Sequence, residues 1–441
     1  MSINFYRWNE IDETTKAGIM RRSQADIDDM IAIVEPIIKD VKARGDTALI
    51  DYAKKFDKAE ITNLKSTAEE FAAAENALDE DLKAAIAHGI RNVQKFHDEQ
   101  MLRDEKDRSW MVEIEPGVFA GEQINAIESV GLYVPRGKGA FPSALYMLAI
   151  PAVIAGVKNV AIVSPPTPEG TTDAATLYTA KLCGIKNVYK CGGAQAIAAL
   201  AYGTQTIPQV KKVLGPGSPY VAAAKRVCSV IMDPGMPAGP SESIVLADET
   251  ADPENTCWDI LNEGEHGEDS AALLVTHDEK LAKFVQQNLP SRIAELPEPH
   301  KTICTKVMGQ DGNERGYGGI ILTENLSQSI EIANTYAPEH LLLKIADPDS
   351  ALHRLTHAGE ILIGEYTAFS LGNYATGVNH VLPTGGWAHT YSCTSVWDFL
   401  KRTSLSKCTH EGFEAIKNSV ITLTDYEGFP AHGDALRKRK I

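Results

Sequence analysis

The sequence predicts an α/β protein with two parallel-sheet units of incomplete doubly wound type. Short apolar segments alternate with helical segments from about residue 129, and the alternation begins again after residue 242. Such alternation is typical of parallel sheets that are covered by helices. Glycines gather where strands are expected to meet helices, as in the ligand-binding loops at the carboxyl ends of strands in open α/β sheets. The length of 441 residues suggests about three domains.

The region before this alternation, residues 24–130, is predicted to be mostly helical. Apolar residues recur with helical spacing from Ile27 to Val41, and Gly45-Asp46 ends the run. A second helical stretch covers about 79–105 and carries a dense row of charged side chains, which indicates a solvated face.

Each sheet unit has its own expected elements. The first has strands at 129–134, 159–164 and 187–190, and helices at 143–155, 173–182 and 194–202. The second has strands at 244–247, 271–276, 319–322, 340–345 and 360–363, and helices at 253–263, 277–288, 327–336 and 351–357. The segment after about 386 is expected to form one or two helices, and it is too short for a core of its own. We therefore expect residues 1–128 with 243–385 to form one α/β domain, residues 129–242 a second, and residues 386–441 a docking segment.

Composition excludes several classes of protein. The 43 Lys and Arg against 59 Asp and Glu give a net charge of −16, which argues against general binding of nucleic acid or anionic membranes. No secretory signal and no apolar stretch of about 20 residues is visible. The seven cysteines are scattered and form no C-x-x-C pair, so reduced thiols in a cytoplasmic protein are expected. Neither the G-x-G-x-x-G fingerprint nor a P-loop is present.

Two short segments combine carboxylates with imidazoles. Glu263 and His266 are three residues apart on one helical face, a spacing that suits half of a metal site; the alternative is a set of polar residues that cap a helix. Glu339 and His340 are adjacent where a helix meets an apolar strand. Histidine suits proton transfer near neutral pH and glutamate can activate water, whereas the alternative is an ion pair in a loop.

Two further segments hold polar side chains in loop-like surroundings. Asn373, Asn379 and His380 lie in a stretch rich in glycine and proline, where functional side chains are common. Glu427 and His432 are five residues apart near the C-terminus.

Taken together, these segments and the sequence between them resemble the histidinol dehydrogenase family. The resemblance covers about residues 25–440, and its strings come in the family's order. The strings are GGAQAIAALAYGT (192–204), GPG (215–217), AGPSES (238–243), GEHG (264–267), APEHL (337–341) and NHVLPT (379–384).

The resemblance implies a fold and a reaction. Members have two incomplete Rossmann-like domains and small terminal segments that are exchanged in a homodimer. They use zinc and NAD to oxidise an amino alcohol to its carboxylate in two hydride transfers, through an aldehyde held on the enzyme. For histidinol dehydrogenase proper, the reaction is L-histidinol to L-histidine, a step of histidine biosynthesis.

The resemblance also implies roles for individual residues. His340 would take the hydroxyl proton, and Glu339 would activate the water that attacks the aldehyde. Zinc would be bound by Glu263, His266, Asn373 and His432, the last reaching in from the partner subunit. The substrate would contact Ser241, Glu263, His266, His340, Asn373, His380, Glu427 and His432. NAD would contact Tyr133, Gln195 and Ser218.

The chain departs from the family pattern at informative positions. Glu263 stands where the family has Gln, and Asn373 where it has Asp, so the two changes together keep the charge of the zinc ligands. Ser218 replaces an Asn at the cofactor loop. Arg136 and Lys138 add positive charge to the loop after Tyr133; they could attract a phosphate or an anionic substrate, or simply form solvated surface.

Histidinol is therefore the leading substrate, with two alternatives. The first is a paralogue that oxidises another small polar alcohol, such as a sulfonated propanediol. The second is a non-catalytic binding protein on the same scaffold, which the two altered zinc positions suggest and the intact Glu339-His340 pair opposes.

Overall fold

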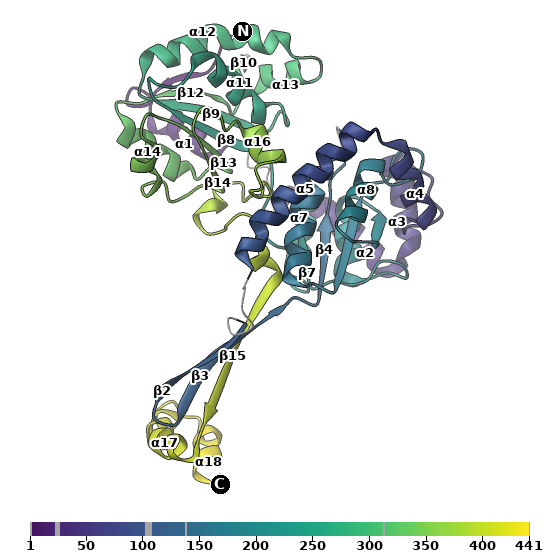
Figure 1. Ribbon diagram of the computed structural model, residues 1–441, viewed down its shortest axis with the longest axis vertical. Helices are drawn as coiled ribbons and strands as arrows, with labels where there is room; N and C mark the ends of the chain where they lie inside the picture. Colours follow the sequence, from purple (N-terminus) through teal and green to yellow (C-terminus); the bar gives the residue numbers. More distant parts are fainter. Residues whose placement is uncertain (1, 23–26, 102–107, 137–138, 312–313, 441) are drawn as a thin grey trace.

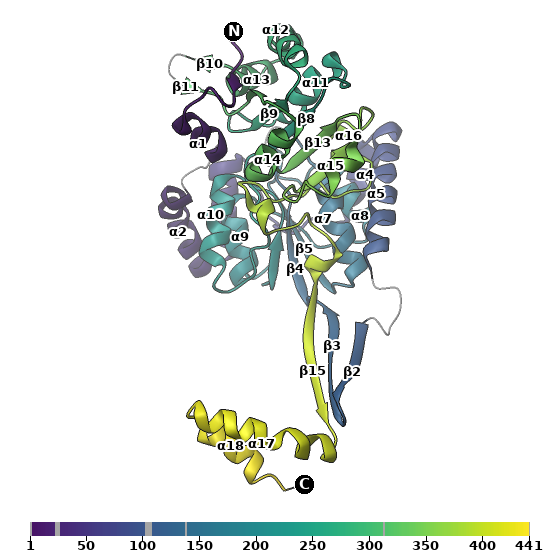
Figure 2. The same ribbon diagram turned by 90° about the vertical axis from the view of Figure 1, so that its left-hand side faces the viewer.

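The computed structural model describes the chain except residues 1, 23–26, 102–107, 137–138, 312–313 and 441. It has two α/β domains and an arm that extends away from them (Figures 1 and 2). The parallel sheets expected from the sequence are present, one in each domain. No helix in the described part of the chain is long and apolar enough to cross a membrane.

The first domain contains a six-stranded parallel sheet in the order β1-β12-β9-β8-β13-β14. The strands are β1 (Phe5–Arg7), β8 (Glu242–Ala247), β9 (Ala271–Thr276), β12 (Gly319–Leu322), β13 (His340–Lys344) and β14 (Glu360–Ile363). The helices are α1 (Glu13–Arg21), α11 (Pro253–Gly264), α12 (Glu279–Glu295), α13 (His300–Met308), α14 (Leu326–Tyr336), α15 (Pro348–Leu352) and α16 (Phe369–Tyr374). A short hairpin, β10 (Gln310–Asp311) and β11 (Glu314–Arg315), precedes β12.

Both faces of this sheet are buried, which explains why its strands read as continuous apolar runs. Val245 and Leu342 pack into a cluster with α11, α12 and α13, whereas Ile244 and Leu341 pack into a second cluster with α14.

The second domain contains a four-stranded parallel sheet in the order β6-β5-β4-β7. The strands are β4 (Ser129–Tyr133), β5 (Asn159–Ser164), β6 (Val188–Lys190) and β7 (Lys212–Leu214). The helices that follow them are α7 (Pro142–Ala155), α8 (Ala174–Leu182), α9 (Gly193–Tyr202) and α10 (Pro219–Cys228).

The N-terminal helices cover this second sheet, which differs from the expected boundaries. They are α2 (Ile27–Arg44), α3 (Asp46–Tyr52), the π-helix η1 (Ala53–Asp57), α4 (Ala68–Ala77) and α5 (Glu80–Gln100). Val34 of α2 shares a core cluster with Ile197 of α9, and Val93 of α5 shares one with Leu145 of α7. Residues 27–100 therefore belong with 129–242, and of the N-terminal elements that the structure describes, only β1 and α1 join the first domain. An apolar helical face shows that a helix packs on something, but it does not identify the sheet.

The arm is a three-stranded antiparallel sheet that ends in a pair of helices. Its strands are β2 (Ser109–Glu115), β3 (Val118–Ala126) and β15 (Leu400–Cys408), in the order β15-β3-β2. The 3-10 helices η2 (Trp387–His389) and η3 (Val396–Phe399) lead into it, and α17 (His410–Tyr426) and α18 (Pro430–Arg437) follow it. The expectation of a mostly helical region to residue 130, and of helices alone after 386, was therefore incomplete. Every residue of β2 is exposed in the single chain, so β2 lacks the buried face that gives a strand its alternating pattern.

Candidate active site

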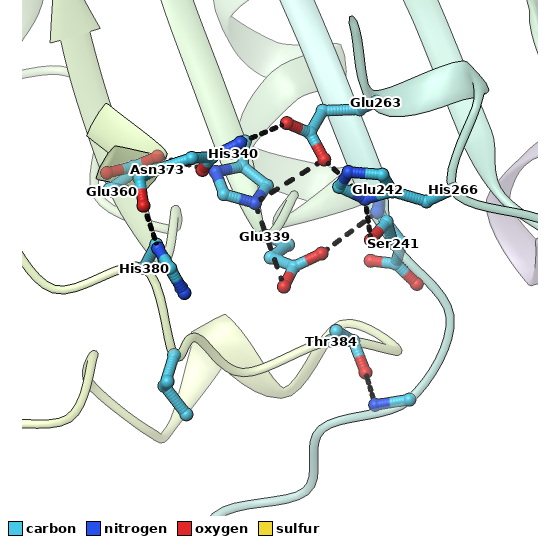
Figure 3. Close-up of polar contacts among 12 residues, drawn as sticks. Ser241, Glu242, Glu263, His266, Glu339, His340, Glu360, Asn373, His380 and Thr384 are labelled. Carbon is cyan, nitrogen blue, oxygen red and sulfur yellow. Dashed lines mark hydrogen bonds and ion pairs between the residues drawn. The ribbon is translucent and has the colours of Figure 1, made fainter. Parts of the chain in front are cut away.

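The charged residues of the site gather at the amino ends of strands in the six-stranded sheet. Glu242, His340 and Glu360 are the first residues of β8, β13 and β14, three neighbouring parallel strands. We expected ligands at the carboxyl ends of strands, and for this sheet the gathering is at the opposite edge. The preceding loops place acidic residues where these strands begin, and Glu339 immediately precedes β13 (Figure 3).

This edge faces the second domain. The Tyr146 hydroxyl in α7 donates to the Tyr374 carbonyl at 2.7 Å, and Asn379 Nδ2 donates to the Met147 carbonyl at 2.6 Å. Because α7 follows β4, these contacts bring the carboxyl edge of the four-stranded sheet toward the amino edge of the six-stranded sheet.

His340 is the centre of the site. Its Nε2 lies 3.7 Å from Glu339 Oε1 and 3.8 Å from Glu263 Oε2, and its Nδ1 lies 2.5 Å from Glu360 Oε1 (Figure 3). Burial alone would lower the pKa of His340, but the three surrounding carboxylates raise it to about 10. The three carboxylates therefore stabilise the protonated form of the ring, the form that His340 takes after it has accepted a proton.

Glu339 is the second proton-handling group. Its side chain is buried, and Oε2 accepts the Glu242 backbone N–H at 3.0 Å. Burial raises the pKa of Glu339 to about 8 in spite of the opposing charge of His340. A carboxyl group with such a pKa can exchange protons close to neutral pH.

A second cluster lies beside this pair and includes three of the four predicted zinc ligands. Glu263 Oε1 accepts from Asn373 Nδ2 at 2.8 Å, and Glu263 Oε2 lies 3.0 Å from His266 Nδ1. His266 Nδ1 is also 2.8 Å from the Ser241 hydroxyl. Although burial opposes it, His266 and His340 hold the pKa of Glu263 well below its usual range, and Glu263 raises the pKa of His266.

The donor set of this cluster fits a zinc ion in chemistry but is incomplete. Asn373 Oδ1 and Glu263 Oε2 are buried and form no aligned hydrogen bond with any described residue, and a carboxylate, an amide oxygen and an imidazole are all zinc donors. In the described part of the chain, no group of three or more His, Cys, Asp or Glu side chains is arranged to hold a metal ion. A complete shell needs a further ligand.

The two predicted C-terminal residues are not brought to this cluster within one chain. Glu427 is the C-cap of α17 and His432 lies in α18, and both helices are at the far end of the arm (Figures 1 and 2). Both residues are exposed.

His380 lies next to Asn373. Its Nδ1 donates to the Asn373 carbonyl oxygen, and burial lowers the pKa of the ring to about 4. The imidazole is therefore neutral, with Nε2 available to accept. The Gly239 N–H donates to Thr384 Oγ1 at 2.6 Å, which ties the loop before Ser241 to the loop after His380.

A supporting ion pair behind the site was not expected from the sequence. Arg22 Nη1 lies 2.5 Å from Glu242 Oε2, and the guanidinium stacks on the Tyr336 ring at 3.7 Å. Glu242 Oε1 accepts the Gly385 N–H at 2.8 Å. Glu360 was also missed. Its only sequence signal is that it begins a predicted strand, because pairing with the strand of His340 cannot be read from the chain.

The predicted cofactor residues lie at the carboxyl edge of the four-stranded sheet. Tyr133 ends β4, and its hydroxyl accepts the Gly193 N–H at 3.1 Å. Gln195 is buried in α9, and Ser218 is the N-cap of α10. Gly215 has φ +121, and a Cβ there would lie 2.1 Å from the Tyr133 carbonyl oxygen. Arg136 Nη1 donates to the Pro166 carbonyl at 3.4 Å, whereas Lys138 is outside the described residues.

Two parallel-sheet domains that meet around a buried acid–base pair define a class of α/β enzyme built for proton transfer. Comparison with known proteins identifies the family. The family model described as "Histidinol dehydrogenase" matches residues 20–440. Histidinol dehydrogenase of Synechocystis is 50% identical, with 96% of this chain and 95% of that protein covered.

Two further comparisons point to the same family. A "Histidinol dehydrogenase homolog" of Rhizobium meliloti is 44% identical, with 99% of this chain and 94% of that protein covered. The crystal structure of histidinol dehydrogenase from Elizabethkingia anophelis matches with a TM-score of 0.91 at 35% identity, covering 99% of this chain and 97% of that one. The chain belongs to the histidinol dehydrogenase family, and it is an NAD-dependent oxidoreductase of that type.

Proposed function

We propose that this enzyme oxidises L-histidinol to L-histidine in two NAD-dependent hydride transfers, a step of histidine biosynthesis. The buried Glu339-His340 pair carries the proposal, because it puts two proton-handling groups beside the cluster of Glu263, His266 and Asn373. In each oxidation His340 Nε2 accepts the substrate's hydroxyl proton while hydride passes to NAD. Between the two steps Glu339 deprotonates the water that attacks the aldehyde.

The charge of the site favours an amino alcohol over a sulfonated diol. Glu263, Glu339 and Glu360 surround His340, and the nearby Arg22 is bonded to Glu242. Such a site attracts the ammonium group of histidinol and repels a sulfonate.

Zinc would be held by Glu263, His266 and Asn373 together with His432 of a second copy. Bound zinc supplies a Lewis acid that orients the substrate. Ser241 and His380 would position the substrate from within the chain, and Glu427 from the second copy. Zinc analysis of chelator-free protein tests this: wild type is expected to hold zinc and a His266→Ala variant to lose it, and equal zinc in both contradicts the ligand set.

We propose a homodimer in which the arms are exchanged. Apolar side chains on the arm are exposed in the single chain, among them Trp110, Ile114 and Leu423, at 43%, 63% and 59%. Isolated chains rarely expose such a set without a partner. Exchange would carry α17 and α18 with Glu427 and His432 to the other copy's site.

Subunit complementation tests exchange and site together. A His432→Ala chain and a Glu339→Gln chain are each expected to be inactive. Co-expressed, they form mixed dimers in which one of the two sites is intact, so activity returns. No recovery in isolated mixed dimers contradicts the contribution from the partner.

Turnover assays test the substrate. Two NADH formed per histidinol support the proposal. Activity only with sulfonated or other diols would favour the paralogue, and no activity with any alcohol would favour a binding protein.

The NAD contacts are proposed to be Tyr133, Gln195 and Ser218. We place the enzyme in the cytoplasm, which agrees with seven cysteines that form no disulfide in the described part of the chain.

A further inference from the structure

Glu360 and His340 face each other at the start of two neighbouring strands. They are direct Cα partners in the parallel pair β13–β14. Their side chains are 6% and 4% exposed, and Glu360 Oε1 lies 2.5 Å from His340 Nδ1 (Figure 3). A short contact between two buried groups in register fixes the imidazole relative to the sheet.

This contact decides which nitrogen of His340 is available. A carboxylate only accepts hydrogen bonds, so in the neutral imidazole Nδ1 carries the hydrogen and Nε2 is left as the acceptor. Nε2 is the nitrogen near Glu339 and Glu263, on the reactive side. The Phe369 ring packs edge-on against the imidazole at 5.8 Å and limits its tilt.

The second oxygen of Glu360 shows that the residue is poorly suited to a purely structural role. Oε2 is buried and has no hydrogen-bond partner in the described part of the chain. Gly372 leaves room for it, since a Cβ there would lie 3.3 Å from Oε2. A buried carboxylate with one oxygen unsatisfied stabilises a fold less than an apolar side chain of the same size would.

We propose that Glu360 is a positioning residue for His340, which it holds in the tautomer and orientation needed of a base. The inference rests on the proposed function of His340. When the substrate's hydroxyl proton moves to Nε2 and hydride moves to NAD⁺, His340 becomes an imidazolium. Glu360 stabilises that charge through Nδ1–H without taking the proton.

The main test is Glu360→Gln, which keeps the shape and removes the charge. We expect kcat to fall about 10- to 100-fold, with little change in KM for histidinol or in zinc content. Glu360→Asp keeps the carboxylate but shortens the side chain by one methylene, so its kcat is expected to fall less than that of Glu360→Gln. Glu365→Gln is the matched control, because Glu365 follows the same strand and pairs with Lys344 at 2.9 Å, away from His340. Its kcat is expected to equal that of wild type.

A double-mutant cycle separates positioning from packing. If Glu360 acts through His340, then Glu360→Gln costs nothing further in a His340→Ala background, measured by single-turnover NADH formation. Full activity of Glu360→Gln, or an equal loss in both backgrounds, overturns the inference. Wild-type turnover by His340→Ala would instead overturn the proposed function, and the inference with it.

Discussion

The two parallel sheets use opposite edges, and the edges are built from different chemistry. The four-stranded sheet offers its carboxyl edge, where turns such as Gly192-Gly193 and Gly215–Gly217 bring backbone N–H groups and helix N-termini forward. The six-stranded sheet offers its amino edge, which is lined by the buried charges of Glu242, Glu339, His340 and Glu360. A backbone edge suits a phosphate-bearing cofactor, whereas a charged edge suits proton transfer. Substitutions at the amino edge of the six-stranded sheet should therefore change mainly kcat, and substitutions at the carboxyl edge of the four-stranded sheet mainly the KM for NAD.

The largest expected effect is at the charged edge. His340→Ala should lower kcat by about 10² to 10⁴-fold, because a positioned base contributes that much. The dissociation constant for NAD, measured by calorimetry, should stay close to that of wild type. If His340→Ala weakened NAD binding by a factor as large as its loss in kcat, the two edges would not have separate roles.

The ion pair behind that edge should matter for stability. Arg22→Met leaves Glu242 buried without its cation and is expected to cost about 3–5 kcal/mol in the free energy of unfolding. Burial already raises the pKa of Glu242 to about 7 with Arg22 present, and losing Arg22 raises it further.

The raised pKa of Glu242 also fixes how the stability of the Arg22→Met variant depends on pH. The folded variant holds the proton of Glu242 to higher pH than wild type does, so the variant should lose stability relative to wild type as pH rises above about 7. Denaturant unfolding curves of wild type and variant, recorded at about pH 6 and about pH 8.5, test this pH dependence. A deficit that shrinks as pH rises would contradict the assignment.

At the backbone edge, Gly215→Ala should act on the cofactor. The residue's φ of +121 and the 2.1 Å approach of a Cβ to the Tyr133 carbonyl force the loop to move. Strain of about 1–3 kcal/mol is expected. It should appear as a raised KM for NAD, with kcat at saturating NAD largely kept. A fall in kcat alone would mean that this edge also takes part in the chemistry.

The smallest effect is expected for Tyr133→Phe. It removes the hydroxyl that accepts the Gly193 N–H at 3.1 Å and leaves the packing of the ring intact. A lost hydrogen bond of about 1 kcal/mol corresponds to about a fivefold rise in KM for NAD. An unchanged KM in initial-rate measurements would remove this hydroxyl from the cofactor edge.

Much of the local structure could be predicted from the chain. The predicted strand at 159–164 is confirmed as β5 and that at 271–276 as β9, because buried parallel strands leave continuous apolar runs. The Glu263/His266 and Glu339/His340 pairs could be singled out because residues that are close along the chain stay close in the fold. The resemblance to a family added Asn373 to the first pair, and the structure places its amide against Glu263.

The sequence by itself determined most element types of the two parallel-sheet units, the presence of the two sheets and which short segments carry acid–base side chains, since these follow from local periodicity and residue chemistry. Only the tertiary structure decided that α2–α5 cover the second sheet, that the exposed strand β2 pairs with β3 in an arm, and that Glu360 meets His340. It also decided that the charged edge is the amino edge. Each of these depends on which distant segments pack together, and strand pairing and helix docking leave no signal in one chain's local pattern.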